Sequence, residues 1–168
     1  MTNSHFVTYL NDHRAGARFA IELLERLSDF DSDPSLAEFA AELLPQIEED
    51  YAVLNRIAVA QNTDANIVKE FAGWIAEKLS RAKLRLNQDP SIGAFESLEM
   101  LSLGILGKLK LWEVLQMLGN EVKCLEGIDF VQLLTRAQHQ HDLVEGKRKS
   151  LARRTFVTGV CPNGEADA

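Results

Sequence analysis

The chain has 168 residues, a formal net charge of -7 at pH 7 and two cysteines, the second of which lies in a polar C-terminal stretch. A domain of about this length buries roughly 70% of the surface that its unfolded chain exposes, so a core can form without covalent or metal staples. The cysteine content excludes a disulfide framework and a thiolate zinc cluster, and the negative charge disfavours nucleic acid as a partner.

The first residues, Met1 to His5, lack the basic start and the apolar stretch of a signal peptide. No segment reaches the run of about 18 apolar residues that is needed to cross a bilayer. We therefore expect a cytoplasmic protein without a membrane span.

Apolar residues recur at spacings of three and four through nearly every segment, which predicts an all-α fold. The first predicted helix covers about residues 4–28. The second extends to about residue 60 and begins after Asp33-Pro34, because an aspartate can cap the free amides and proline suits the first helical position.

Three more helices are predicted along the rest of the chain. The third and shortest covers about residues 65–86. The fourth, about 91–118, follows a second Asp-Pro start signal, and the fifth covers about 128–156. Residues 157–168 have no helical periodicity, so we expect a flexible tail behind a single domain formed by residues 1–156.

The order of long and short helices indicates two helical hairpins joined by a spanning connection. We therefore predict an antiparallel four-helix bundle, built from up-down pairs with a crossover, plus one additional shorter helix. This is the layout of ferritin-like bundles.

Several polar residues occupy positions that the apolar stripes assign to the interior. His13 and Asp50 lie on inward stripes and equally far from the centre of the first hairpin, which predicts that they share one depth. Di-iron proteins of the ferritin-like class carry inward glutamates and Glu-x-x-His pairs. The nearest match is Gln138-x-x-His141, with an amide in place of the carboxylate, and Glu99 is the best-placed acid of the fourth helix.

These residues also have a purely structural interpretation. A buried polar group needs a hydrogen-bond partner, so Asp50 and His13 could satisfy each other without a metal. Within the run Gln138 to Asp142, we expect His139 and Gln140 to face solvent. The chain shows no Ser-His-Asp order, no glycine-rich phosphate loop and no zinc-finger spacing.

Four stretches carry a resemblance to known proteins: Tyr9 to His13 with Ala15-Gly16, Ile47 to Asp50, Gly73 to Leu79, and Leu98 to Gly104. Over about its first 155 residues, the chain resembles a group of uncharacterised bacterial ferritin-like proteins. The resemblance implies a ferritin-like bundle and leaves the activity open, because such bundles include iron oxidases, hydroxylases and members without metal.

Two functional hypotheses follow. In the first and preferred one, the chain is a degenerate, non-enzymatic ferritin-like bundle with a buried polar cluster, and it acts through self-association or a protein partner. In the second, His13, Asp50, Glu99 and His141 bind iron, manganese or zinc, with Gln138 nearby. Such a site would support oxidative or metal-handling chemistry.

Overall fold

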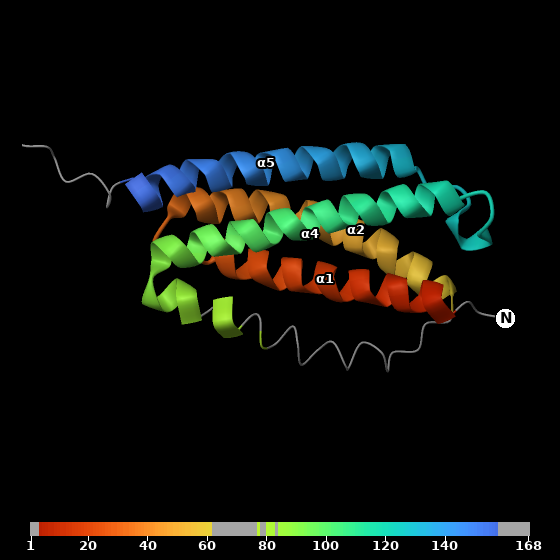
Figure 1. Cartoon of the computed structure of the whole chain (residues 1–168), viewed down its shortest axis with the longest axis horizontal. Coiled ribbons are helices and arrows are strands. Elements are labelled where there is room, and N and C mark those ends of the chain that lie inside the picture. The colour runs from red at the N-terminus through yellow and green to blue at the C-terminus, as the bar shows by residue number, and fades with distance from the viewer. Residues whose placement is uncertain (1–3, 62–76, 78–79, 83, 158–168) are drawn as a thin grey trace, which may run out of the picture.

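The computed structural model describes residues 4–61, 77, 80–82 and 84–157, and every regular element in them is helical. The elements are α1 (Ser4–Ser28), α2 (Pro34–Ala60), α4 (Pro90–Leu118), the short 3-10 helix η1 (Lys123–Leu125) and α5 (Phe130–Val157) (Figure 1). The all-α prediction is confirmed for this part of the chain, with helix ends close to the predicted positions. None of the described helices combines the length and the apolar character needed to cross a bilayer.

The predicted third helix is described only in part. Residues 80–82 and 84–88 are helical, whereas most of the segment 62–79 lies outside the described residues. The predicted tail also lies outside them, apart from Val157, which ends α5.

The two Asp-Pro start signals mark helix starts as predicted. Asp33 accepts a hydrogen bond from the backbone N–H of Leu36 at 3.1 Å, and Asp89 accepts one from the backbone N–H of Ile92 at 3.2 Å. A proline follows each aspartate at the start of α2 and α4. Each carboxylate therefore satisfies an amide that has no partner within its own helix.

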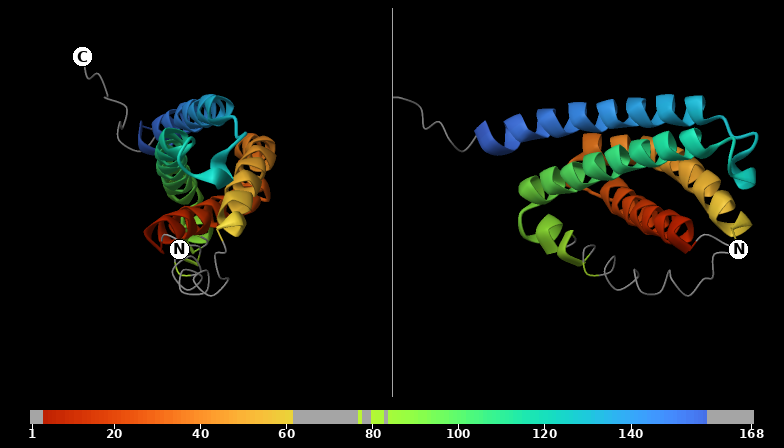
Figure 2. Two further views of the ribbon diagram at one scale, coloured as in Figure 1. Left: turned by 90° about the vertical axis from the view of Figure 1, so that its right-hand side faces the viewer. Right: turned by 45° about the vertical axis from the view of Figure 1, so that its right-hand side comes forward.

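The four long helices form two antiparallel hairpins, α1 with α2 and α4 with α5, and α1 also packs against α4. The end-on view in Figure 2 shows the helices around a common axis in the order α1, α2, α5, α4. The end of α2 and the start of α4 lie at opposite ends of the molecule, so these two helices run parallel (Figure 1).

Two apolar clusters fill the interior. The first joins the C-terminal halves of α1 and α5 to the N-terminal halves of α2 and α4 and contains Leu24, Leu43 and Leu98. The second lies toward the other end and contains Leu10 and Trp112. Because neighbouring helices run antiparallel, the two clusters meet near the middle of each helix.

The start of α4 is packed closely against the chain that precedes it. A Cβ atom at Gly93 would lie 2.6 Å from the backbone nitrogen of Leu86, so only glycine fits there. Ala82 and Leu86 are themselves buried in the first apolar cluster. This contact anchors the segment 84–88 to the four long helices.

Candidate functional site

A polar layer crosses the interior where the two apolar clusters meet. It consists of Asp50 on α2, Lys108 on α4, and Arg136 and Gln140 on α5. Asp50 is 1% exposed and Gln140 is 0% exposed. Each lies at a helical spacing of three or four residues from apolar core positions, so the period of the helix directs it inward.

Cationic side chains surround the buried carboxylate of Asp50. The ammonium group of Lys108 donates to Asp50 Oδ2 and to Gln140 Oε1. Arg136 donates to Asp50 Oδ1 through Nη2, and its Nη1 donates to Glu49 Oε2 at 2.8 Å. Both oxygens of Asp50 are thus engaged by cations from two other helices, the pairing that a buried carboxylate requires.

The charges in this layer are not balanced inside the protein. One buried carboxylate faces two cations, whereas Glu49, the second acid on Arg136, is 68% exposed and lies at the surface. Burial lowers the pKa of Lys108 and Arg136 adds to this effect, although attraction by Asp50 opposes both. The layer around Lys108 thus holds two cations and one buried carboxylate, and the second acid lies at the surface.

A cleft of about 200 Å³ opens between α1 and α4 beside this layer. His13, Asp50 and Lys108 contribute polar groups to its wall, which is otherwise mostly apolar. The rings of His13 and Tyr9 form an edge-to-face contact, with 4.7 Å between ring centroids. Burial lowers the pKa of His13, partly opposed by Asp12, and this favours a neutral imidazole.

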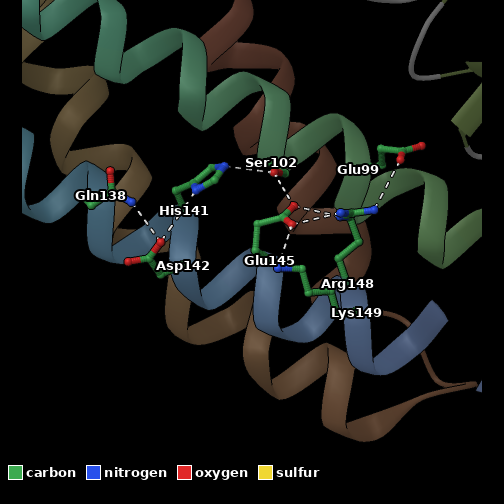
Figure 3. Close-up of polar contacts among 8 residues, drawn as sticks. All are labelled: Glu99, Ser102, Gln138, His141, Asp142, Glu145, Arg148 and Lys149. Atoms are coloured by element: carbon green, nitrogen blue, oxygen red, sulfur yellow. Dashed lines mark hydrogen bonds and ion pairs between the residues drawn. The ribbon is translucent and has the colours of Figure 1, made fainter. Parts of the chain in front are cut away.

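A second polar cluster joins α4 to α5 (Figure 3). Ser102 Oγ donates to Glu145 Oε1 at 2.7 Å, and Nε2 of His141 lies 3.3 Å from the same hydroxyl oxygen. Arg148 donates to both oxygens of Glu145, at 2.8 and 2.9 Å. Its Nη1 also lies 3.4 Å from Glu99 Oε1.

These contacts determine which proton each group can transfer. Hydrogen bonds from Arg148, followed by the one from Ser102, lower the pKa of Glu145 to about 2. A hydroxyl has one proton, and that of Ser102 is committed to Glu145, so His141 must donate through Nε2–H in its contact with Ser102. His141 does not act as a base toward Ser102, and the arrangement does not fit a nucleophilic serine.

The structure distributes the five predicted metal ligands over several places. His13 and Asp50 line the same cleft, but the hydrogen bonds of Asp50 go to Lys108 and Arg136 rather than to the imidazole. The prediction that His13 and Asp50 lie at a similar depth agrees with their positions in this cleft. Asp50 pairs with Lys108 and Arg136, however, and not with His13.

The other three predicted ligands lie at the α4–α5 side of the molecule. His141 belongs to the second polar cluster, and Glu99 lies at the surface beside Arg148. Gln138 is exposed and donates to Asp142 Oδ1 at 2.9 Å (Figure 3), and it does not line the cleft that holds His13.

This arrangement does not fit a di-iron centre, in which acids and histidines from four helices converge on one point. In the part of the chain that the structure describes, no group of three or more His, Cys, Asp or Glu side chains is placed to hold a metal ion. The acids Asp50, Glu99 and Glu145 are instead paired with lysine or arginine.

Three residues of the polar layer were not predicted from the sequence. The expectation that Gln140 faces solvent is wrong, because this side chain is wholly buried against Lys108. Lys108 lies three residues after Ile105 and four before Trp112, which are core positions. That spacing places Lys108 on the inward face of α4. Together with the inward position of Asp50, it could have predicted a buried ion pair from the sequence.

No protein-family model, no curated protein and no solved structure matches the chain.

Proposed function

We propose that the chain is a non-enzymatic helical bundle with the ferritin-like order of helices, and that lysine and arginine side chains balance its interior acids in place of metal ions. The parallel run of α2 and α4 supports this order, because ferritin-like bundles connect their two hairpins by one long crossover. The observation that carries the proposal is the engagement of both Asp50 oxygens by Lys108 and Arg136.

The energetics of a buried carboxylate also support the proposal that cationic side chains, rather than metal ions, balance Asp50. A metal ion at Asp50 would lie beside Lys108 and Arg136, which already donate to the two carboxylate oxygens and whose positive charges repel a cation. Displacing either cation would leave it without its partner in a buried or partly buried position, which is strongly unfavourable. The polar layer therefore serves to hold α2, α4 and α5 together.

We further propose that the bundle acts through self-association along the outer face of α4. The apolar side chains Leu103, Leu106 and Met117 are exposed there, and Lys110 pairs with Glu113 between them at 3.0 Å. In a two-fold symmetric pair of antiparallel α4 helices, an axis between positions 110 and 113 would place each Lys110 opposite the second copy's Glu113. The same axis would place Leu106 opposite Met117, so the face is self-complementary.

Native mass spectrometry of protein purified without chelator tests both parts, because one spectrum reports the number of copies and any bound metal. We expect a metal-free dimer. Stoichiometric iron, manganese or zinc would overturn the first part and favour the metal-handling alternative, and a monomer would overturn the second.

A matched pair of variants locates the interface. Leu106 on α4 is 41% exposed and Leu143 on α5 is 40% exposed. We expect Leu106→Glu to produce monomers, because it places a charge in the apolar contact, and Leu143→Glu to leave the dimer intact. Equal behaviour of the two variants would contradict an interface on α4.

A further inference from the structure

The cleft between α1 and α4 contains space that no side chain fills. Gly16 on α1 and Gly104 and Gly107 on α4 line it, and a Cβ atom at any of the three would meet nothing within 4 Å. Glycines thus keep the two helix faces open here. The cleft is accessible from the surface, because Gly16 and Gly104 are exposed.

The size and lining of the cleft suit a small apolar group. Leu54, Ile105, Leu111 and Trp112 form its deep wall and belong to the buried core. A dry apolar cavity of about 150 Å³ binds benzene in another protein, and the volume here is about 200 Å³. The cleft therefore has space for one ring together with a small polar substituent.

The polar end of the cleft favours an anionic substituent. An ammonium group has three N–H donors. Lys108 donates one hydrogen bond to Asp50 and one to Gln140, which leaves a third donor for a ligand. Asp50 cannot neutralise the local charge alone, since Arg136 also binds it. Of the other titratable groups in the cleft, Asp12 is exposed at the mouth, where solvent screens its charge, and Tyr51 is partly buried. Burial lowers the pKa of His13, which favours its neutral form.

We infer that this cleft is a binding site for a small organic monocarboxylate with an apolar body of about one ring, whose carboxylate pairs with Lys108. The inference goes beyond the proposed function, which assigns no ligand to the bundle. It also stands apart from the metal question, because it needs only the cleft and the ammonium group of Lys108.

Three fluorinated probes with the same ring test the chemistry of the site: 4-fluorobenzoate, 4-fluorobenzyl alcohol and 4-fluorobenzylamine. Fluorine NMR line broadening of each probe, titrated with the wild-type protein, gives its affinity. We expect one-to-one binding of 4-fluorobenzoate and about tenfold weaker binding of the alcohol, because a hydrogen bond to a charged group is stronger than one between neutral groups. The amine, which Lys108 repels, should be the weakest.

Two glycine variants test the location. Gly104→Leu should abolish binding of 4-fluorobenzoate by filling the cleft. Gly146→Leu is the matched control, because Gly146 is an exposed glycine on α5 with equally open surroundings, outside the cleft. Circular dichroism of both variants verifies that the helices are intact.

A third variant tests the charge. Lys108→Met should lower the affinity for 4-fluorobenzoate toward that for the alcohol while leaving the alcohol affinity nearly unchanged. If this variant unfolds, the glycine pair still decides the location and the probe series still decides the charge preference. No binding of 4-fluorobenzoate, equal or tighter binding of the alcohol or amine, or retention of binding in Gly104→Leu would overturn the inference, whatever metal content or oligomeric state native mass spectrometry finds.

Discussion

The carboxylate of Asp50 is the most constrained acidic group among the described residues. It is 1% exposed, and its two oxygens accept hydrogen bonds from Lys108 and Arg136. Removing an ion from water costs several kcal/mol, which mutual attraction repays only when the partners are well placed. Lys108 and Arg136 thus stabilise the buried charge of Asp50. Removing any one of the three side chains would leave the remaining charges without a partner, which is strongly unfavourable.

A comparison of two neighbouring acids tests this account. Asp50→Ala leaves Lys108 and Arg136 without their buried partner, so we expect the free energy of unfolding to fall by about 3–5 kcal/mol. Glu49→Ala removes an exposed partner of the same arginine, and the expected loss is below about 1 kcal/mol. Urea unfolding followed by circular dichroism measures both values. Similar losses for the two variants would contradict a specific role for the buried pair.

At the scale of the elements, ion pairs attach α5 to its neighbours on two sides. Arg148 and Glu145 of α5 meet Ser102 and Glu99 of α4 in the second polar cluster. Toward its C-terminal end, Arg154 of α5 donates to Asp33 Oδ2 at 2.7 Å, and Asp33 also caps α2. The second polar cluster is therefore a contact between α4 and α5 whose strength depends on the charge of Glu145.

This contact predicts how stability changes in acid. The pKa of Glu145 is lowered from 4.5 to about 2 in the folded protein, so the folded state holds fewer protons than the unfolded state between these values. The contribution of Glu145 is complete above pH 4.5 and is lost as the pH falls toward about 2. Glu145→Gln should lower stability near neutral pH and weaken the pH dependence inside this window.

Urea midpoints measured across the window check the prediction, with Glu99→Gln as the control. Glu99 also meets Arg148, but at 3.4 Å and at the surface, so its variant should change the pH dependence little. Some dependence should persist in Glu145→Gln because of Asp33. Burial acts to raise the pKa of Asp33, but the backbone N–H of Leu36 and the side chain of Arg154 outweigh it and lower that pKa. An unchanged pH profile in Glu145→Gln would contradict the assignment.

At the scale of the whole molecule, the four long helices share both apolar clusters, one toward each end, and the polar layer lies between them. Each long helix contributes to both clusters, so neither end can open without disturbing the helices that build the other. This sharing favours unfolding as a single cooperative unit.

Two leucines of α4 test this cooperativity. Leu98 lies in the first cluster and Leu115 in the second, and both are fully buried. Each change to alanine should cost about 2–5 kcal/mol and shift one common transition. Circular dichroism reports all helices, whereas tryptophan fluorescence includes the signal of Trp112 in the second cluster. Separate midpoints for the two signals in Leu98→Ala would show that the ends unfold independently.

The sequence by itself determined the all-helical character of the described residues, the two Asp-Pro helix starts and the inward position of Asp50. These features are local, because capping, proline geometry and the 3.6-residue period act within a few turns of one helix. The tertiary structure decided which residues Asp50 meets. Lys108 is 58 positions away along the chain and Arg136 is 86 positions away, so no local pattern could pair them.

The positions of Gln138 and Gln140 show the same division on one helix. The motif spacing singled out Gln138, yet Gln138 is exposed and Gln140 is wholly buried beside Lys108. Side chains two positions apart on an α-helix differ by about 200° in direction. The rotation of α5 about its own axis, relative to α2 and α4, therefore decides which of the two amides faces the interior. The period of α5 places Gln140 close to the apolar stripe of Ala137 and Val144, and the packing of four helices around one core decides that its amide reaches Lys108.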